Sequence, residues 1–289
     1  MVSGGTALHT LEAGGLLRSY RLHVPDTLNA EKAAPLVFVF HGSGDSGYGV
    51  ESFSRFDEIA DREGFIAVYP DSESKNWNDG REVSGIRSQR DKVDDVGFTG
   101  DMIATISKAH KIDPKRIYAA GFSNGAIFAQ LLGAQMAAQF AAIAAVSGGI
   151  AEPLAPKFNP SVPVSVFIIH GTKDPMVPYA GGDVDYHDNG RIISTVDTVK
   201  MWTQRDGFTA KPETGTLADL DPDDHCRVQW TRWMKGKMDT EVLLFAIEGG
   251  GHTWPGGPQF LPVSIIGHVC RDFDAAEAIS DFFKKHPKP

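Results

Sequence analysis

The sequence has few cysteines and no excess of positive charge. Its 289 residues include only two cysteines, Cys226 and Cys270, too few for a disulfide-rich scaffold and without the paired spacing of a zinc site. The two cysteines either pair with each other or stay free. With 28 Lys and Arg against 37 Asp and Glu, the net charge is −9, so most of the surface would repel a phosphate backbone. We therefore expect no nucleic-acid partner.

The sequence also lacks recognisable targeting and membrane segments. Residues 1–6 contain neither a basic leader nor an apolar core, so no signal peptide is visible. Residues 117–151 carry no charge, but Gln130 and Gln135 interrupt this stretch and Gly121 and Gly125 punctuate its start. It reads as a strand, a turn, a buried helix and a second strand. We expect no membrane-spanning helix.

The acidic stretch 219–224 matches no ion-binding template. We interpret it as a solvated loop, with a calcium site as the weaker alternative.

Composition and patterning predict one α/β domain over residues 1–289. Apolar residues make up 42% of the chain and charged residues 22%, as in well-packed globular proteins. Short apolar runs alternate with segments of helical period, which is typical of a mostly parallel sheet with crossover helices on its faces. The expected strands are 19–24, 36–40, 65–69, 117–120, 141–146, 164–169, 228–233 and 242–247. The expected helices are 53–63, 94–108, 124–138, 193–204 and 272–284.

Between the first and second predicted helices, residues 71–92 have no convincing period. A loop of this length in a compact domain either lines a functional site or is a surface excursion.

The pentapeptide Gly121-Phe122-Ser123-Asn124-Gly125 fits the pattern G-x-S-x-G between a predicted strand and a long apolar helix. In that context the serine occupies a sharp strand-to-helix turn that exposes its hydroxyl, and the glycines allow strand and helix to pass closely. A serine hydroxyl is a weak nucleophile near neutral pH. It therefore needs a histidine to take its proton and a carboxylate to hold that histidine.

The partners of Ser123 are expected in the chain order Ser, Asp, His. Asp174 follows the predicted strand 164–169, and His252 lies in a glycine-rich loop after strand 242–247. We predict Ser123, Asp174 and His252 as the catalytic residues, with His268 as the reserve histidine. Two backbone N–H groups should stabilise the oxyanion: that of Asn124, after the nucleophile, and that of Ser43, in the loop after strand 36–40.

Five segments together resemble the poly(3-hydroxybutyrate) depolymerase and feruloyl/acetylxylan esterase group of α/β hydrolases. They are 41–44, 93–98, 121–125, 170–179 and 250–256, and the similarity extends over about residues 17–286. The resemblance implies an α/β-hydrolase fold without a large separate lid domain, and a secreted or periplasmic serine esterase with Ser123, Asp174 and His252 as its triad. It also implies that neither a metal nor an organic cofactor takes part.

The expected substrates are carboxylic esters, most specifically feruloyl or acetyl esters linked to plant polysaccharides. A depolymerase of poly(3-hydroxybutyrate) or hydroxyalkanoate oligomers is the alternative, and a non-catalytic binding protein with a hydrolase fold is a remote one. Trp254 and Trp77 are candidate walls of the substrate site because an aromatic face accepts either a cinnamoyl ring or polyester methyl groups. Core packing explains both tryptophans equally well.

Overall fold

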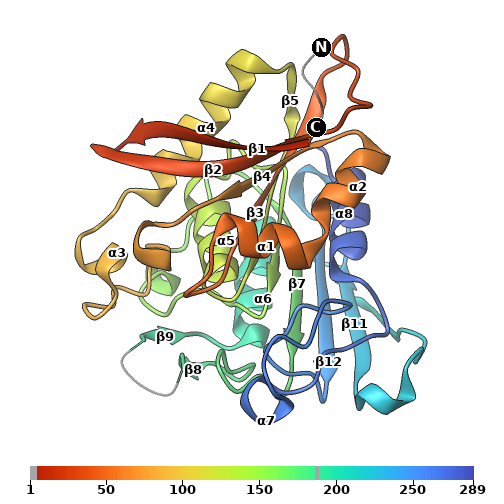
Figure 1. Cartoon of the computed structure of the whole chain (residues 1–289). Helices are drawn as coiled ribbons and strands as arrows, with labels where there is room; N and C mark the ends of the chain where they lie inside the picture. Colours follow the sequence, from red (N-terminus) through yellow and green to blue (C-terminus); the bar gives the residue numbers. More distant parts are fainter. Residues whose placement is uncertain (1–4, 186–188) are drawn as a thin grey trace.

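A ten-stranded sheet forms the centre of the molecule, and helices cover both of its faces (Figure 1). The computed structural model describes residues 5–185 and 189–289. In spatial order the strands are β1 (Gly5–Ala13), β2 (Leu16–Val24), β4 (Ile66–Pro70), β3 (Ala34–Phe40), β5 (Ile112–Phe122), β6 (Ala142–Val146), β7 (Ser165–Gly171), β12 (Val242–Glu248), β11 (Arg227–Trp233) and β10 (Glu213–Thr216).

The six central strands, from β4 to β12, are parallel, and the two strands at each edge are antiparallel. This is the mostly parallel α/β-hydrolase sheet that the sequence predicts. A separate short ribbon pairs β8 (Gly182–Asp183) with β9 (Arg191–Ile192).

Alternate residues of the central strands supply two hydrophobic cores, one on each face of the sheet. In β3, Leu36, Phe38 and Phe40 belong to one core, whereas Val37 and Val39 belong to the other. The first core is closed by the helices α4 (Asp95–Ala109), α5 (Asn124–Gln135) and α6 (Thr195–Asp206). The second is closed by α1 (Gly47–Ser54), α2 (Phe56–Glu63) and α8 (Ala275–Lys285).

The expected elements are present, with shifted ends and one division. The helix predicted over 53–63 is two helices, α1 and α2, because Arg55 between them adopts a left-handed conformation with φ of 59°. Residues 117–151 form β5, α5 and β6 as predicted, and no helix among the described residues is long and apolar enough to cross a bilayer. Two neighbouring aspartates at the start of α4, Asp94 and Asp95, have different roles. Asp94 caps the helix by accepting the N–H of Gly97, and Asp95 is buried with Arg18 at 2.7 Å.

Strands β1 and β10 are absent from the sequence prediction. Both lie at the edges of the sheet, and most of their residues are exposed. An edge strand with little burial has no alternating apolar pattern, which is the signal that reveals a half-buried strand.

Candidate active site

Four predicted site residues lie at the end of the sheet where the parallel strands have their carboxyl ends, and each directly follows a different strand or its loop. Ser43 follows β3, Ser123 follows β5, Asp174 follows β7 and His252 follows β12. Open α/β sheets bind their ligands at this edge. The fold therefore brings together residues that are far apart in the sequence.

Ser123 occupies a tight turn between β5 and α5, with φ of 57° and ψ of −122°. The flanking glycines make this turn possible. A Cβ atom at Gly121 would lie 2.1 Å from the carbonyl oxygen of Gly125, and a Cβ atom at Gly125 would lie 2.2 Å from that of Phe40. Gly42 also passes close to the nucleophile, since a Cβ atom there would lie 3.2 Å from Cβ of Ser123. The conformation costs energy, and the close packing of strand and helix maintains it.

Asp174 and His252 form a buried hydrogen-bonded pair. Nδ1 of His252 lies 2.8 Å from Oδ2 of Asp174, and both side chains are almost fully buried. The other carboxylate oxygen, Oδ1, accepts the backbone N–H groups of Met176 and Val177 at 2.9 and 2.8 Å. Since a carboxylate only accepts, Nδ1 of His252 carries the proton and Nε2 keeps a free lone pair.

The loop that carries His252 is fixed against residues 266–268. Gly251 donates its N–H to the carbonyl of His268 at 3.0 Å, and His252 donates its N–H to that of Ile266 at 2.6 Å. A Cβ atom at Gly251 would lie 2.0 Å from the oxygen of Ile266. His268, the reserve histidine, packs its ring on His225. It is therefore His252 that the fold brings to Asp174.

A second histidine also contacts Asp174. Nε2 of His170 lies 3.4 Å from Oδ2 of Asp174 and 2.8 Å from the carbonyl of Val177, and Nδ1 lies 2.7 Å from the hydroxyl of Thr195. Burial raises the pKa of Asp174, but the electrostatic attraction and the hydrogen bonds that His252 and His170 offer to the carboxylate outweigh burial and hold this pKa well below its ordinary value. Asp174 is therefore ionised at neutral pH.

The two predicted oxyanion donors have free N–H groups. Over residues 5–185 and 189–289, the backbone N–H groups of Ser43 and Asn124 donate to no acceptor. Asn124 is the first residue of α5, so its N–H points out of the helix without an intrahelical partner. Two unpaired donors beside a serine are the arrangement that stabilises a developing negative oxygen.

Ser123 lines two cavities, one mainly apolar and the other mainly polar. The apolar cavity, of about 470 Å³, is also lined by His252 and by the apolar side chains of Phe53, Phe122, Phe260, Leu261 and Met176. The other, of about 410 Å³, has a polar lining that includes Ser74, Asn76, Arg87, Asp185 and Asn189. Ser43 and Met176 border both. No hydrogen bond joins Ser123 to His252 in the described structure, as is common for such pairs before substrate binds.

The two tryptophans expected to form walls of the substrate site do not reach these cavities. Trp77 is fully buried and Trp254 is 1% exposed, and neither lines a cavity that contains Ser123. Trp77 stacks on Phe128 with ring centroids 5.0 Å apart, while Trp254 packs edge-on against Phe53 and Phe122. Both indoles belong to the hydrophobic cores, so Trp254 supports the cavity wall from behind.

Instead, the aromatic lining of the apolar cavity comes from Phe260, which is 45% exposed, from the half-buried Phe53 and from the buried Phe122. Sequence reasoning missed all three as lining residues. Phe122 occupies a variable position of the G-x-S-x-G motif, and Phe260 follows the glycine-rich loop in a segment without any periodic signal, so neither position is marked by its sequence context.

Residues 71–92 form a loop that lines the polar cavity, and hydrogen bonds of a buried polar cluster hold this loop in place. Asp79 is fully buried and bonds the side chains of Arg81, Gln89 and Asn124. Asn124 in turn accepts the backbone N–H of Trp77 at 2.7 Å. Of the two alternatives for this loop, the structure favours the one in which it lines a cavity, because Ser74, Asn76 and Arg87 border the polar cavity that Ser123 also lines.

The chain matches known hydrolases over most of its length. The phospholipase/carboxylesterase family matches residues 27–201. NocK of Nocardia uniformis subsp. tsuyamanensis, which carries an esterase name, is 28% identical over 286 residues, covering 96% of this chain and 82% of that protein. Feruloyl esterase B of Piromyces equi is 30% identical over 237 residues, covering 79% of this chain but only 41% of that protein.

A solved structure agrees with the fold. The acetyl xylan esterase from Aspergillus awamori superposes with a TM-score of 0.61 at 14% identity, covering 96% of this chain and 99% of that one. At this identity the likeness concerns the fold alone. The family match over residues 27–201 and the esterase relatives show that the chain belongs to the phospholipase/carboxylesterase family of α/β hydrolases and is a carboxylic ester hydrolase.

Proposed function

We propose that this carboxylic ester hydrolase forms an acyl-enzyme on Ser123, with His252 as general base and Asp174 as the residue that orients it. The observation that supports this assignment best is the 2.8 Å contact between Asp174 and His252, because it leaves Nε2 of His252 unprotonated in the cavity that Ser123 also lines.

In the first half of the reaction, the hydroxyl oxygen of Ser123 attacks the ester carbonyl carbon while Nε2 of His252 takes the hydroxyl proton. The carbonyl oxygen becomes negative and accepts the N–H groups of Ser43 and Asn124. His252 then gives its proton to the departing alcohol oxygen as the carbon–oxygen bond breaks. In the second half, water replaces the alcohol, releases the acid and restores the free hydroxyl of Ser123.

We further propose that the substrate joins an apolar acyl group to a hydroxyl-rich alcohol, as in a feruloyl ester of a polysaccharide. Two chemically unlike cavities meet at Ser123, one lined by phenylalanines and the other by Asn76, Arg87 and Asn189. An ester that bridges them would need one apolar and one polar half. The name of the Piromyces equi relative agrees with this substrate class. A hydroxyalkanoate oligomer has the same aliphatic chemistry on both sides of its ester bond and fits the pair of cavities less well.

The nucleophile is tested with Ser123→Ala and a serine-directed phosphonate. We expect kcat on a p-nitrophenyl ester to fall by several orders of magnitude, and a covalent mass increase in the wild type that the variant lacks. Unchanged thermal unfolding of the variant is the control for folding. A variant that keeps more than about a tenth of the turnover would require another nucleophile. An unlabelled, inactive wild type would point to the non-catalytic binding protein.

The substrate class is tested with methyl ferulate, acetylated xylan and hydroxybutyrate oligomers. Phe260→Ala removes an apolar wall, so kcat/KM should fall more for methyl ferulate than for an acetyl ester. Asn189→Ala changes the polar cavity and should lower kcat/KM for a polysaccharide-linked ester while leaving methyl ferulate nearly unaffected. A preference for hydroxybutyrate oligomers over both other substrates would support the depolymerase alternative.

A further inference from the structure

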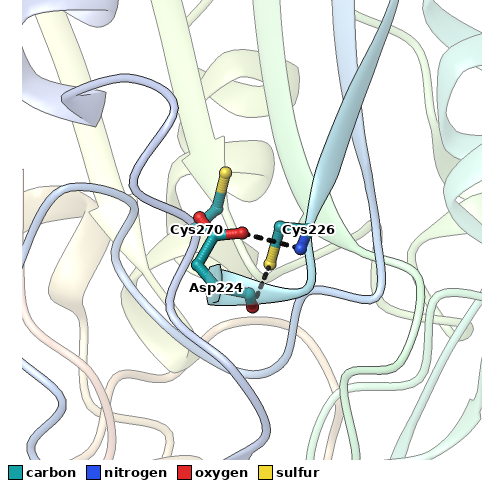
Figure 2. A group of neighbouring side chains, drawn as sticks. All are labelled: Asp224, Cys226 and Cys270. Carbon is teal, nitrogen blue, oxygen red and sulfur yellow. Dashed lines mark hydrogen bonds between the residues drawn. The ribbon is translucent and has the colours of Figure 1, made fainter. Parts of the chain in front are cut away.

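The only two cysteines of the chain lie next to each other in its interior. Cys226 precedes β11 and Cys270 lies between α7 (Val263–Ile266) and α8, and both side chains are fully buried. Their sulfur atoms and a carboxylate oxygen of Asp224 all lie within 4.8 Å of one another (Figure 2). Two cysteines in 289 residues would seldom meet by chance, so this proximity indicates a chemical role for the pair.

Asp224 joins the two backbone segments that carry these cysteines. Oδ1 of Asp224 accepts the N–H of Cys226 at 2.7 Å, and Oδ2 accepts the N–H of Arg271, the neighbour of Cys270, at 2.6 Å. Figure 2 shows the bond from Cys226 to the Asp224 side chain. The carboxylate thus bridges the two segments and keeps the two cysteine backbones at a fixed separation.

The chemistry of the three side chains favours a disulfide over a metal site. Both oxygens of Asp224 already accept backbone N–H groups, and a structural zinc site uses four ligands where this cluster offers three. Metal binding also needs thiolates. Interaction with the Cys270 thiol, followed by burial, holds the pKa of Cys226 well above its ordinary value, so this thiol stays protonated near neutral pH.

We propose that Cys226 and Cys270 form a disulfide when the chain folds in the presence of a disulfide oxidant such as oxidised glutathione. A bond forms between the two Sγ atoms, the sulfur–sulfur bond of the oxidant breaks, and the two thiol protons leave with the two reduced oxidant thiols. Closure to the usual length of about 2.05 Å requires rotation of the thiols about their Cα–Cβ bonds. Because both sulfur atoms are buried, exchange takes place before this region packs or during its local opening.

A disulfide between Cys226 and Cys270 would restrict the motion of the loop 249–257, which carries His252. Cys270 accepts the N–H of Gly256 through its carbonyl at 2.9 Å, and Gly249 packs on the carbonyl of His225, next to Cys226. Residues 226 and 270 therefore flank the loop 249–257 from two sides. A disulfide between them would restrict the opening of this loop.

The first test is the redox state after refolding. The chain is unfolded in denaturant with dithiothreitol, refolded in mixed reduced and oxidised glutathione, then denatured and treated with N-ethylmaleimide. We expect a mass lower by two hydrogen atoms and no attached maleimide, with a tryptic peptide pair that contains both cysteines. Two attached maleimides, or glutathione bound to either cysteine, would overturn the proposal.

The second test is the thermal stability of the oxidised and reduced wild-type protein. Closing the loop from 226 to 270 should raise the unfolding temperature by roughly 5 to 10 °C. The double variant Cys226→Ala/Cys270→Ala is the matched control, and its unfolding temperature should be the same in oxidising and reducing buffer. An equal shift in the double variant would attribute the effect to the buffer and overturn the stabilising role. Neither test measures ester hydrolysis, so their outcome is independent of the assignment of Ser123.

Discussion

Nδ1 of His41 lies 2.7 Å from the carbonyl oxygen of Gly42, in the peptide unit whose N–H belongs to Ser43. Nε2 of the same ring accepts the backbone N–H of Ser72 at 3.2 Å, so the imidazole is neutral with its proton on Nδ1. Burial lowers the pKa of His41 and keeps it neutral. Because the C=O and N–H of a trans peptide point in opposite directions, a bond that holds the Gly42 oxygen also directs the N–H of Ser43.

We predict that His41→Ala lowers kcat by about 10- to 100-fold with little change in KM, since a misdirected oxyanion donor affects the transition state more than substrate binding. Steady-state kinetics on a p-nitrophenyl ester measures this. His41→Asn is the matched control, because the asparagine amide supplies a donor near the position of Nδ1 and should restore much of kcat. If His41→Asn is as slow as His41→Ala, the hydrogen bond to Gly42 is not the cause.

Asp174→Asn should lower kcat by about 10³- to 10⁴-fold. The asparagine oxygen still accepts the N–H groups of Met176 and Val177, which turns the amide NH₂ toward Nδ1 of His252. That donor favours the tautomer with its proton on Nε2, which is unable to accept a proton from Ser123. The substitution keeps the size of the side chain, so circular dichroism should remain unchanged. A loss of less than tenfold would show that Asp174 does not orient the base.

Much of this site could be predicted because its parts leave local marks in the sequence. Ser123 lies between glycines that strand and helix require at close approach, and Asp174 and His252 follow strongly apolar strands. Chain order then limits the choice of partners. The central strands were predicted for the same reason, since burial on both faces produces continuous apolar runs.

The remaining features depend on tertiary packing that leaves no local pattern. An indole can either line a cavity or fill a core, and only the positions of Phe128, Phe53 and Phe122 show that Trp77 and Trp254 fill cores. The bonds of Asp79 with Arg81 and Asn124 join segments through a buried cluster that has no periodicity. Burial of charged side chains is uncommon, so these residues look like surface residues in the sequence.

Asp79→Ala should lower the free energy of unfolding by about 3 kcal/mol, because it leaves the buried guanidinium of Arg81 without its carboxylate. It should also lower kcat, because the side chain of Asn124 loses its hydrogen bond to Asp79 and the N–H of Asn124, the proposed oxyanion donor, is then less firmly positioned. Urea unfolding and steady-state kinetics measure the two effects.

The matched control is Glu82→Ala, three residues further along the chain, where the side chain is exposed and forms an ion pair with exposed Lys157. It should change the free energy of unfolding by no more than about 0.5 kcal/mol. Equal effects of the two substitutions would mean that the buried cluster does not stabilise the loop.

Asp206 gives the clearest expectation for the pH dependence of stability. Its carboxylate is fully buried at the end of α6, beside the side chain of Thr240 and the backbone of Val164, whose hydrogen bonds only partly offset the effect of burial. Burial raises its pKa to about 7, whereas an unfolded aspartate titrates near 3.9. Between about pH 4 and 7 the unfolded chain releases this proton while the folded chain retains it, so the contribution of Asp206 to stability falls as pH rises through this window.

Asp206→Asn removes this titration. Relative to the wild type, the variant should gain about 2 to 3 kcal/mol in free energy of unfolding when pH is raised from 5 to 8. Urea unfolding at both pH values gives the double difference, in which the other titrating groups cancel. Asp101→Asn, at an exposed position of α4, should give a double difference close to zero. If the wild type and Asp206→Asn lose or gain stability in parallel across this range, the buried carboxylate is already ionised at pH 5 and burial does not raise its pKa.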